Sequence, residues 1–217
     1  KLSTNENNTS NHHFIAHILH ADNQSRRITD LWHGRKNGSN HRQSDHRSGI
    51  RKMKTLSEYI KEVATEEIGV REVGFTNKGE RVQQYQAATS LKGTGWPYCA
   101  AFICFVVREA MARYERDTGK KLTFKRPTTA AAYGFDEWSL AQDNSTKTRR
   151  KHGGESIGIF SLDSVSHCGI AISKPDANGF FNTIEGNSNN KGSRDGGGVV
   201  RHRRHVSQVR DWVTFTV

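Results

Sequence analysis

The chain has 217 residues, of which 33 are Lys or Arg and 22 are Asp or Glu, so its formal net charge is +11 and only 33% of it is hydrophobic. This length suggests one domain or at most two. No run approaches the roughly 18 apolar residues of a membrane span, and no signal peptide is recognisable. Three cysteines are too few for a disulfide framework, so at least one stays a thiol. We expect a monomer made in the cytoplasm, without membrane insertion.

The first 52 residues differ in composition from the rest. They contain nine Lys or Arg against four Asp or Glu (9 − 4 = +5), seven of the eleven His and eleven hydrophobic residues. A segment this polar buries too little apolar surface to offset the entropy lost on ordering the chain. The spacing HHxxxHxxH at 12–20 suits a metal on a helix, but it has no Cys or carboxylate partner nearby. We therefore expect 1–52 to be a disordered or non-native His-rich tail, and 53–217 to be the domain.

Two helices are predicted at the start of this domain. The run Thr55-Leu56-Ser57-Glu58 is a capping box, apolar residues follow it at helical spacing, and Gly69 ends the helix. Asn77 with Glu80 opens a second helix in the same way, which is expected to continue to about Ala88.

The densest apolar stretch of the chain predicts a third, buried helix. It begins near Trp96, has Pro97 in its first turn and ends at Gly119. Its N-terminal half is apolar on all sides, so we expect that half at the centre of the domain. A fourth helix is predicted over 128–140, with its aromatic residues on one face.

Beyond these helices the hydrophobic pattern changes to the period of strands. Strands are predicted at 156–162, 167–173, 180–186, 198–204 and 211–217. The basic segment 146–155 is interpreted as a loop. Because helices come first and consecutive short strands follow, we predict an α+β fold with an antiparallel sheet packed against the helices.

The predicted buried helix carries a candidate nucleophile. Cys99 lies in its first turn, where free backbone N–H groups and the helix dipole favour an anion and lower the pKa of a thiol. An isolated Cys is more often a small core residue, so the assignment needs a partner. The histidines of the domain are His152, His167, His202 and His205. Only His167 begins an otherwise apolar strand, which makes it the best candidate base.

A carboxylate that could orient this histidine follows on the next strand. If the strands on either side of Asp176 form a hairpin centred there, His167 lies opposite Glu185, and Asn187 is on the same face as Glu185. A carboxylate beside an imidazole fixes its tautomer and supports its protonated form. The alternative is an ordinary exposed Glu before a turn.

Three strings in this order resemble the CHAP family. They are GTGWPYCAAF at 93–102, HCGIA at 167–171 and TIEGNSN at 183–189, and the resemblance covers about residues 55–217. CHAP proteins are cysteine, histidine-dependent amidohydrolases/peptidases that cleave bacterial peptidoglycan, often as phage lysins (endolysins of bacteriophages). The resemblance implies an enzyme of this kind, a cysteine amidase or endopeptidase that degrades the cell wall.

The resemblance also implies a papain-like fold and a set of site residues. The catalytic residues would be the nucleophile Cys99, the base His167, the orienting Glu185 and the accessory polar group Asn187. Trp96 and Tyr98, which flank the nucleophile in the first string, would contact the substrate.

The sequence departs from the family pattern at three positions. Tyr98 stands where the family usually has Trp, Glu155 stands where a strand usually opens with Asp, and Cys168 replaces an apolar residue. Cys168 is expected to point to the face opposite His167 and to serve packing, and Cys104 is expected in the core. No Asp-x-Asp-x-Asp-Gly calcium loop is present, so neither a metal nor another cofactor is expected.

The implied reaction is hydrolysis of an amide through a thioester, with the backbone N–H of Cys99 holding the oxyanion. A second oxyanion donor is required, for which Gln83, Gln84 and Tyr85 are candidates. The bond cut is either the N-acetylmuramoyl-L-alanine amide or a peptide cross-link. The partner is bacterial peptidoglycan, reached after release through phage or prophage lysis or by specialised secretion.

The basic charge permits a second class of function. The residues that could follow nucleic-acid phosphates are Arg201, Arg203, Arg204, Lys147, Arg149, Arg150 and Lys151. No helix-turn-helix, zinc finger or aromatic-interleaved strand accompanies them, and a polyanionic cell wall explains the same charge. We therefore expect no nucleic-acid partner. A non-catalytic cell-wall-binding module is the remaining alternative.

Overall fold

A computed structural model of the protein describes residues 53–142, 146–150, 157–189, 191 and 196–217, with the backbone alone for 146–150. The predicted tail, Glu155, His152 and Lys151 therefore lie outside the described residues. No helix in the described part of the chain is both long and apolar enough to cross a membrane.

Two helices follow the signals in the sequence closely. Helix α1 (Leu56–Glu66) begins at the predicted capping box, in which Thr55 accepts from the Glu58 N–H and the Glu58 carboxylate accepts the Thr55 N–H at 2.6 Å. Helix α3 (Cys99–Thr118) ends where Gly119 adopts a left-handed conformation with φ 70°. Glycine suits this position because it has no Cβ to clash there.

The other two helices start a few residues away from their predicted starts, and so does α3. Helix α2 (Glu80–Gln86) follows a cap at Gly79 and not at Asn77, because Asn77 has φ 53° instead of the extended backbone of a capping residue. Pro97 precedes α3 rather than lying in its first turn. Helix α4 (Gly134–Leu140) begins six residues after the predicted start. Near that predicted start the Thr129 hydroxyl oxygen accepts the Ala131 backbone N–H at 3.1 Å, and this local hydrogen bond competes with helix formation.

Within the described residues the sheet has six strands in the order β1-β6-β2-β3-β4-β5, and every neighbouring pair is antiparallel. The strands are β1 (Thr146–Arg150), β2 (Gly158–Leu162), β3 (Cys168–Ala171), β4 (Phe180–Ser188), β5 (Gly198–His205) and β6 (Val209–Phe215). Helices thus come first and the antiparallel sheet follows, which confirms the predicted α+β fold.

Strand β1 corrects the interpretation of 146–155 as a loop, because 146–150 pairs with β6 at an edge of the sheet. Its sequence, TKTRR, has no apolar alternation to mark it as a strand. Charged side chains are common on edge strands, where they discourage pairing with other chains, and they conceal the strand from a hydrophobicity pattern.

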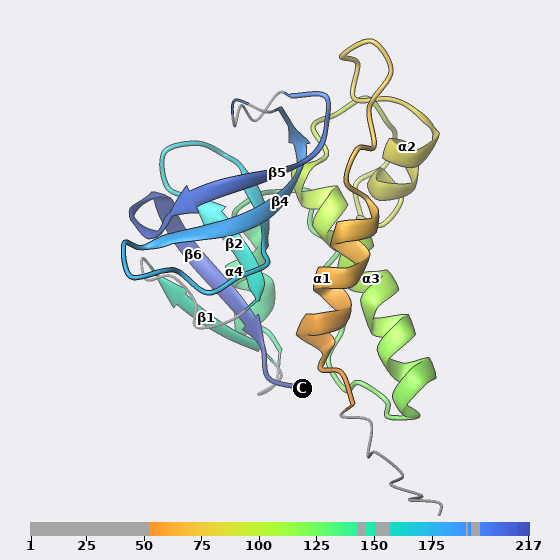
Figure 1. Ribbon diagram of the computed structural model, residues 1–217. Coiled ribbons are helices and arrows are strands. Elements are labelled where there is room, and N and C mark those ends of the chain that lie inside the picture. The colour runs from red at the N-terminus through yellow and green to blue at the C-terminus, as the bar shows by residue number, and fades with distance from the viewer. Residues whose placement is uncertain (1–52, 143–145, 151–156, 190, 192–195) are drawn as a thin grey trace, which may run out of the picture. The chain divides into compact units, whose positions relative to one another are not determined.

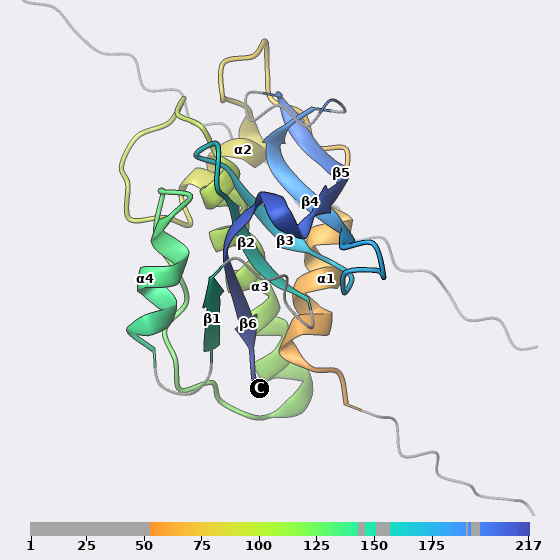
Figure 2. The same cartoon turned by 90° about the vertical axis from the view of Figure 1, so that its left-hand side faces the viewer.

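Helices and sheet form layers that place the N-terminus of α3 over β3 and β4 (Figures 1 and 2). Helix α4 packs along β1 and β6. The main core joins the buried half of α3 to one face of the sheet, including Ile170 and Ile184. The opposite face carries a smaller cluster around Phe160, Phe181 and Trp212, whose ring centroids lie 4.9–6.3 Å apart.

Candidate active site

Cys99 is the first residue of α3, so the unpaired N–H groups of the first helical turn lie beside its side chain. The residue is 7% exposed, and it lines a pocket of about 260 Å³. The other lining residues are Leu91, Trp96, Pro97, Ala130, Ala131, Ala132, Ser166 and Asn187. The thiol is thus largely buried but reachable from a surface pocket.

The environment of Cys99 favours its thiolate form. A hydrogen bond with the Cys168 thiol is the largest cause that lowers its pKa, and burial acts in the opposite direction. The His167 side chain and the backbone N–H of Ala100 lower the pKa further, so that it lies well below the usual range of a thiol. Burial holds the pKa of Cys168 well above that range, and Cys168 therefore stays a protonated donor.

This contact adds a role that the sequence did not indicate for Cys168. The residue belongs to the core between sheet and helices, as a packing role predicted. It also lies against the sulfur of Cys99, since each thiol affects the pKa of the other. Cys104 lies in the same core, where its thiol donates to the Thr129 carbonyl oxygen at 3.3 Å, and burial raises its pKa to about 12.

The structure brings His167 and Glu185 together in the buried interior. His167 Nε2 lies 2.9 Å from Glu185 Oε2, and neither side chain is more than 1% exposed. Burial alone would lower the pKa of His167, but its interactions with Cys99 and Glu185 raise it to about 9. The hydrogen bond with Glu185 engages Nε2 of His167. Nδ1 is buried without another partner among the described residues, and is therefore the nitrogen that can exchange a proton with Cys99.

The hairpin that joins these two residues has a different register from the predicted one. Ile170 pairs with Ile184, and this register continued along the hairpin sets Gly169, rather than His167, across from Glu185. His167 lies just before β3, so the Glu185 carboxylate reaches its imidazole diagonally across the hairpin. A Cβ at Gly169 would lie 2.6 Å from Glu185 Cγ, so only glycine leaves room for the carboxylate at this position.

Two residues that the sequence did not assign to the site hold the Glu185 carboxylate. Arg204 donates from Nε to Oε1 at 2.8 Å and from Nη2 to Oε2 at 2.5 Å. Thr183 donates from its hydroxyl to Oε1 at 2.7 Å. Burial would raise the pKa of Glu185, but Arg204 and His167 lower it to about 2. Sequence reasoning had placed Arg204 among the candidate phosphate contacts.

The two residues expected to contact the substrate, Trp96 and Tyr98, lie in different environments. Trp96 is half-buried and lines the Cys99 pocket. Tyr98 is fully buried, with its ring centroid 6.0 Å from that of Tyr85, and it is not among the residues that line this pocket. Tyr98 is the capping residue of α3, and its side chain belongs to the main core. Asn187 lines the pocket with φ 55°, at the irregularity that interrupts β4.

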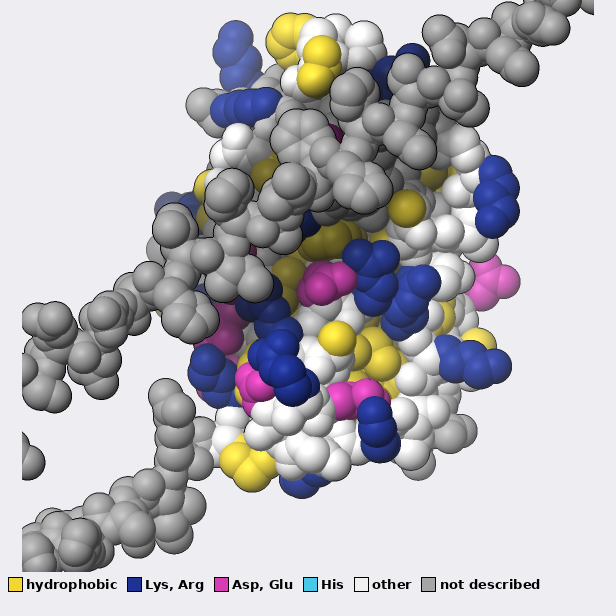
Figure 3. Space-filling view, turned by 90° about the vertical axis from the view of Figure 1, so that its right-hand side faces the viewer, with side chains coloured by type: hydrophobic (Ala, Val, Ile, Leu, Met, Phe, Trp, Pro, Cys, Tyr) yellow, Lys and Arg dark blue, Asp and Glu magenta, His cyan; other side chains and the backbone are white. Residues whose placement is uncertain are grey.

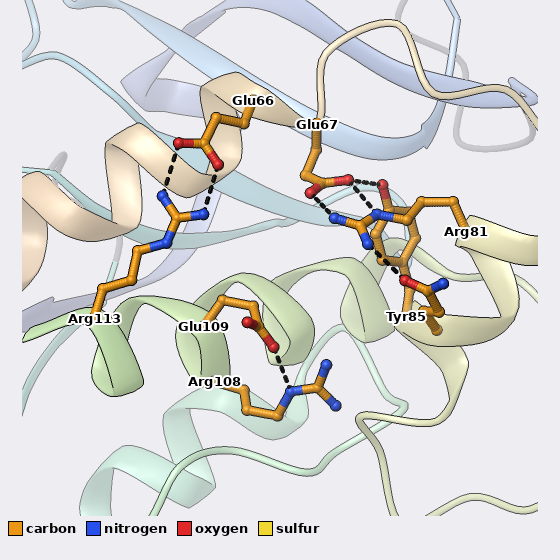
Figure 4. A network of polar contacts seen from close by, with 8 residues as sticks. Glu66, Glu67, Arg81, Tyr85, Arg108, Glu109 and Arg113 are labelled. Atoms are coloured by element: carbon orange, nitrogen blue, oxygen red, sulfur yellow. Dashed lines mark hydrogen bonds and ion pairs between the residues drawn. The ribbon is translucent and has the colours of Figure 1, made fainter. Parts of the chain in front are cut away.

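None of the three residues proposed as the second oxyanion donor lines this pocket. The Tyr85 hydroxyl donates to Glu67 Oε2 at 2.6 Å, within a network that also holds Arg81 (Figure 4). Gln84 accepts from the same arginine at 2.5 Å, and Gln83 is exposed. The backbone N–H groups at the start of α3, by contrast, lie beside the Cys99 side chain.

The other two histidines of the described residues bind partners outside the Cys99 pocket. His202 Nε2 lies 3.0 Å from Ser188 Oγ, and His205 Nε2 lies 2.9 Å from the Asn178 carbonyl oxygen. The described residues include no group of three or more His, Cys, Asp or Glu placed to hold a metal ion.

Comparison with known proteins adds one similarity. No protein-family model and no curated protein matches the chain. Among solved structures, it is similar to the crystal structure of a wild-type endolysin, LysIME-EF1, at 16% identity and a TM-score of 0.42. The match covers 75% of this chain and 64% of the endolysin chain, so this chain spans less than two thirds of that protein's length.

Proposed function

We propose that the protein is a cysteine amidohydrolase or peptidase that cleaves an amide bond of bacterial peptidoglycan through a thioester. The observation that supports the chemistry most strongly is the pairing of Cys99, at a helix N-terminus in an open pocket, with the buried His167–Glu185 pair. The substrate class rests on the three CHAP-like strings in the sequence. The position of the nucleophile at the start of a helix and of the base just before a strand agrees with a papain-like arrangement.

The geometry assigns a role to each group in the reaction. The Cys99 thiolate attacks the amide carbon, a C–S bond forms, and the carbonyl oxygen becomes an oxyanion near the α3 N–H groups. His167 then gives its Nδ1 proton to the leaving nitrogen as the C–N bond breaks. Neutral His167 next takes a proton from water, which attacks the thioester and releases the acid and the thiolate.

The carboxylate and the pocket complete this description. Glu185 holds Nε2 and thereby keeps Nδ1 directed toward Cys99 through both half-reactions. The pocket beside the sulfur is lined by small residues such as Ala131 and by Trp96, with no charged side chain. It therefore suits a short, uncharged part of a peptide next to the bond that is cut.

The described basic residues give little support to nucleic-acid binding. Arg204 is held by Glu185 inside the domain, and Arg203 pairs with Asp176 at 2.6 Å. Lys and Arg alternate with Asp and Glu on the face that carries α1 and α3 (Figure 3), as in the pair between Arg113 and Glu66. The described side chains visible on that face form no continuous basic stripe for a phosphate backbone.

Digestion of purified cell wall tests the proposal. New peptide amino termini matched by free muramic acid carboxyl groups would identify an amidase, and new termini within the cross-links would identify an endopeptidase. Mass spectrometry distinguishes the two products, and the Cys99→Ala variant is the control. Absence of digestion, release of reducing sugar ends, or digestion by the Cys99→Ala variant would each contradict the proposal.

A further inference from the structure

The Glu185 carboxylate is saturated with hydrogen bonds. Oε1 accepts from Thr183 and from Arg204 Nε, and Oε2 interacts with His167 and Arg204 Nη2, so each oxygen has two contacts. A carboxylate has about four lone-pair positions, so no further donor is needed. Glu185 is fully buried and the Arg204 side chain is 11% exposed, so this ion pair is shielded from water.

The charges of the site balance only when Arg204 is counted. The reactive state needs an anionic Cys99 and a cationic His167, and Glu185 adds a second anion. Without Arg204 these three buried groups would carry a net charge of −1, and burial strongly disfavours an uncompensated charge. One anion would then take up a proton. Protonated Glu185 would withdraw the counter-charge from the imidazolium, and protonated Cys99 would no longer be the nucleophile.

We propose that Arg204 is a positioning residue that keeps Glu185 ionised and thereby lets Cys99 and His167 exist as a thiolate–imidazolium pair. This inference rests on the proposed function for its link to hydrolysis. The charge balance itself is a property of the free protein, so it can be measured without substrate.

The surroundings of Glu185 leave Arg204 as its permanent counter-charge. From the β3 side it meets His167 and the neutral thiol of Cys168, and from its own strand it meets the uncharged Thr183. From β5 it meets Arg204 and also His202, which is partly buried and whose pKa is lowered by burial. His202 therefore tends to be neutral when His167 is charged.

The neighbour Arg203 provides a matched control. It alternates with Arg204 along β5, is 59% exposed, and binds Asp176 and the face of the Phe180 ring at 4.4 Å. It carries the same charge on the same strand, but its described contacts are with Asp176 and Phe180 rather than with Glu185. A general effect of removing one positive charge would appear equally in both variants.

The test is the pH dependence of Cys99 alkylation by iodoacetamide in Arg204→Met, Arg204→Lys and Arg203→Met, with peptide mapping to follow Cys99 alone. In Arg204→Met, Glu185 loses two donors and a charge, so its protonation enters the acid range. We expect the acid limb of the alkylation profile to move up by about one pH unit or more, which is a tenfold loss of rate on that limb. Arg204→Lys should recover part of the shift, and Arg203→Met should match the unmodified protein.

Three results would overturn the inference. They are a folded Arg204→Met variant with an unmodified acid limb, an equal shift in Arg203→Met, and a shift in Arg204→Lys as large as that in Arg204→Met. If circular dichroism shows that Arg204→Met does not fold, Arg204→Gln replaces it with the same expectation, because an amide keeps a donor without the charge. Since alkylation needs no cell wall, absence of wall digestion beside the expected shift would contradict the proposed function and leave the role of Arg204 in place.

Discussion

Replacing Glu185 by Gln removes one charge from the centre of a fully buried network and changes the side-chain volume little. Arg204 and His167 would then lose their common counter-ion. Loss of one partner from a buried ion pair destabilises a protein by about 3–5 kcal/mol, because the other charge stays buried without compensation. We therefore expect the free energy of unfolding at pH 7 to fall by about 3 kcal/mol.

The pKa of Glu185 gives a second measure of the same effect. The drop from 4.5 to about 2 corresponds to roughly 3 kcal/mol, at 1.36 kcal/mol per pH unit. Because the folded pKa lies below the unfolded one, this stability is present above pH 4.5 and is lost as the pH falls toward 2. The difference between the unmodified protein and Glu185→Gln should therefore shrink to about 1 kcal/mol near pH 2.5.

Urea unfolding at a series of pH values from 7 downward measures this difference. The matched control is Glu66→Gln, which removes a carboxylate bound by both Nη atoms of Arg113 at 2.7 and 2.6 Å but 53% exposed. An exposed pair contributes about 0–1 kcal/mol, so this variant should change little. A difference for Glu185→Gln that is independent of pH, or no larger than that of Glu66→Gln, would refute the reasoning.

Three further predictions concern the reaction and the tail. Iodoacetamide near pH 6 should label Cys99 first, and peptide mapping should find Cys104 and Cys168 slow because burial raises their pKa; first labelling of Cys168 would contradict the assignment. Cys99→Ser and His167→Ala should each lower the rate of wall digestion by roughly 10⁴-fold with an unchanged circular dichroism spectrum, and Glu185→Gln should lower it less. A chain that starts at Met53 should keep its melting temperature and turnover, and a drop of several degrees would show that the tail docks on the domain.

The elements of the fold that the sequence predicted correctly are those with local signals. The capping box of α1 and the glycine that ends α3 act through neighbouring backbone groups, so a short stretch of sequence contains them. The starts of α2 and α4 depend on conformations that hydrophobic spacing does not encode, such as the left-handed φ of Asn77. Strand β1 forms by antiparallel pairing with β6, and its own residues carry no apolar alternation that would mark it as a strand.

The site shows the same division between local and assembled information. Cys99 and His167 could be proposed because each lies at the end of an apolar element, and that position is visible in the sequence. Their supporting groups come from other parts of the fold: Arg204 reaches Glu185 from β5, and Cys168 reaches Cys99 across the layer between sheet and helix.

Alternation along one strand correctly assigns Cys168 to the face away from His167, but it does not show what covers that face. Helix α3 covers it, and the helix begins with the nucleophile. His167 and Cys168 therefore both act on the sulfur of Cys99, and we propose that the imidazole carries the proton while the thiol stays a protonated donor. Such convergence follows from packing a helix end onto a strand end, which is why the chemistry of this site is concentrated where the two layers meet.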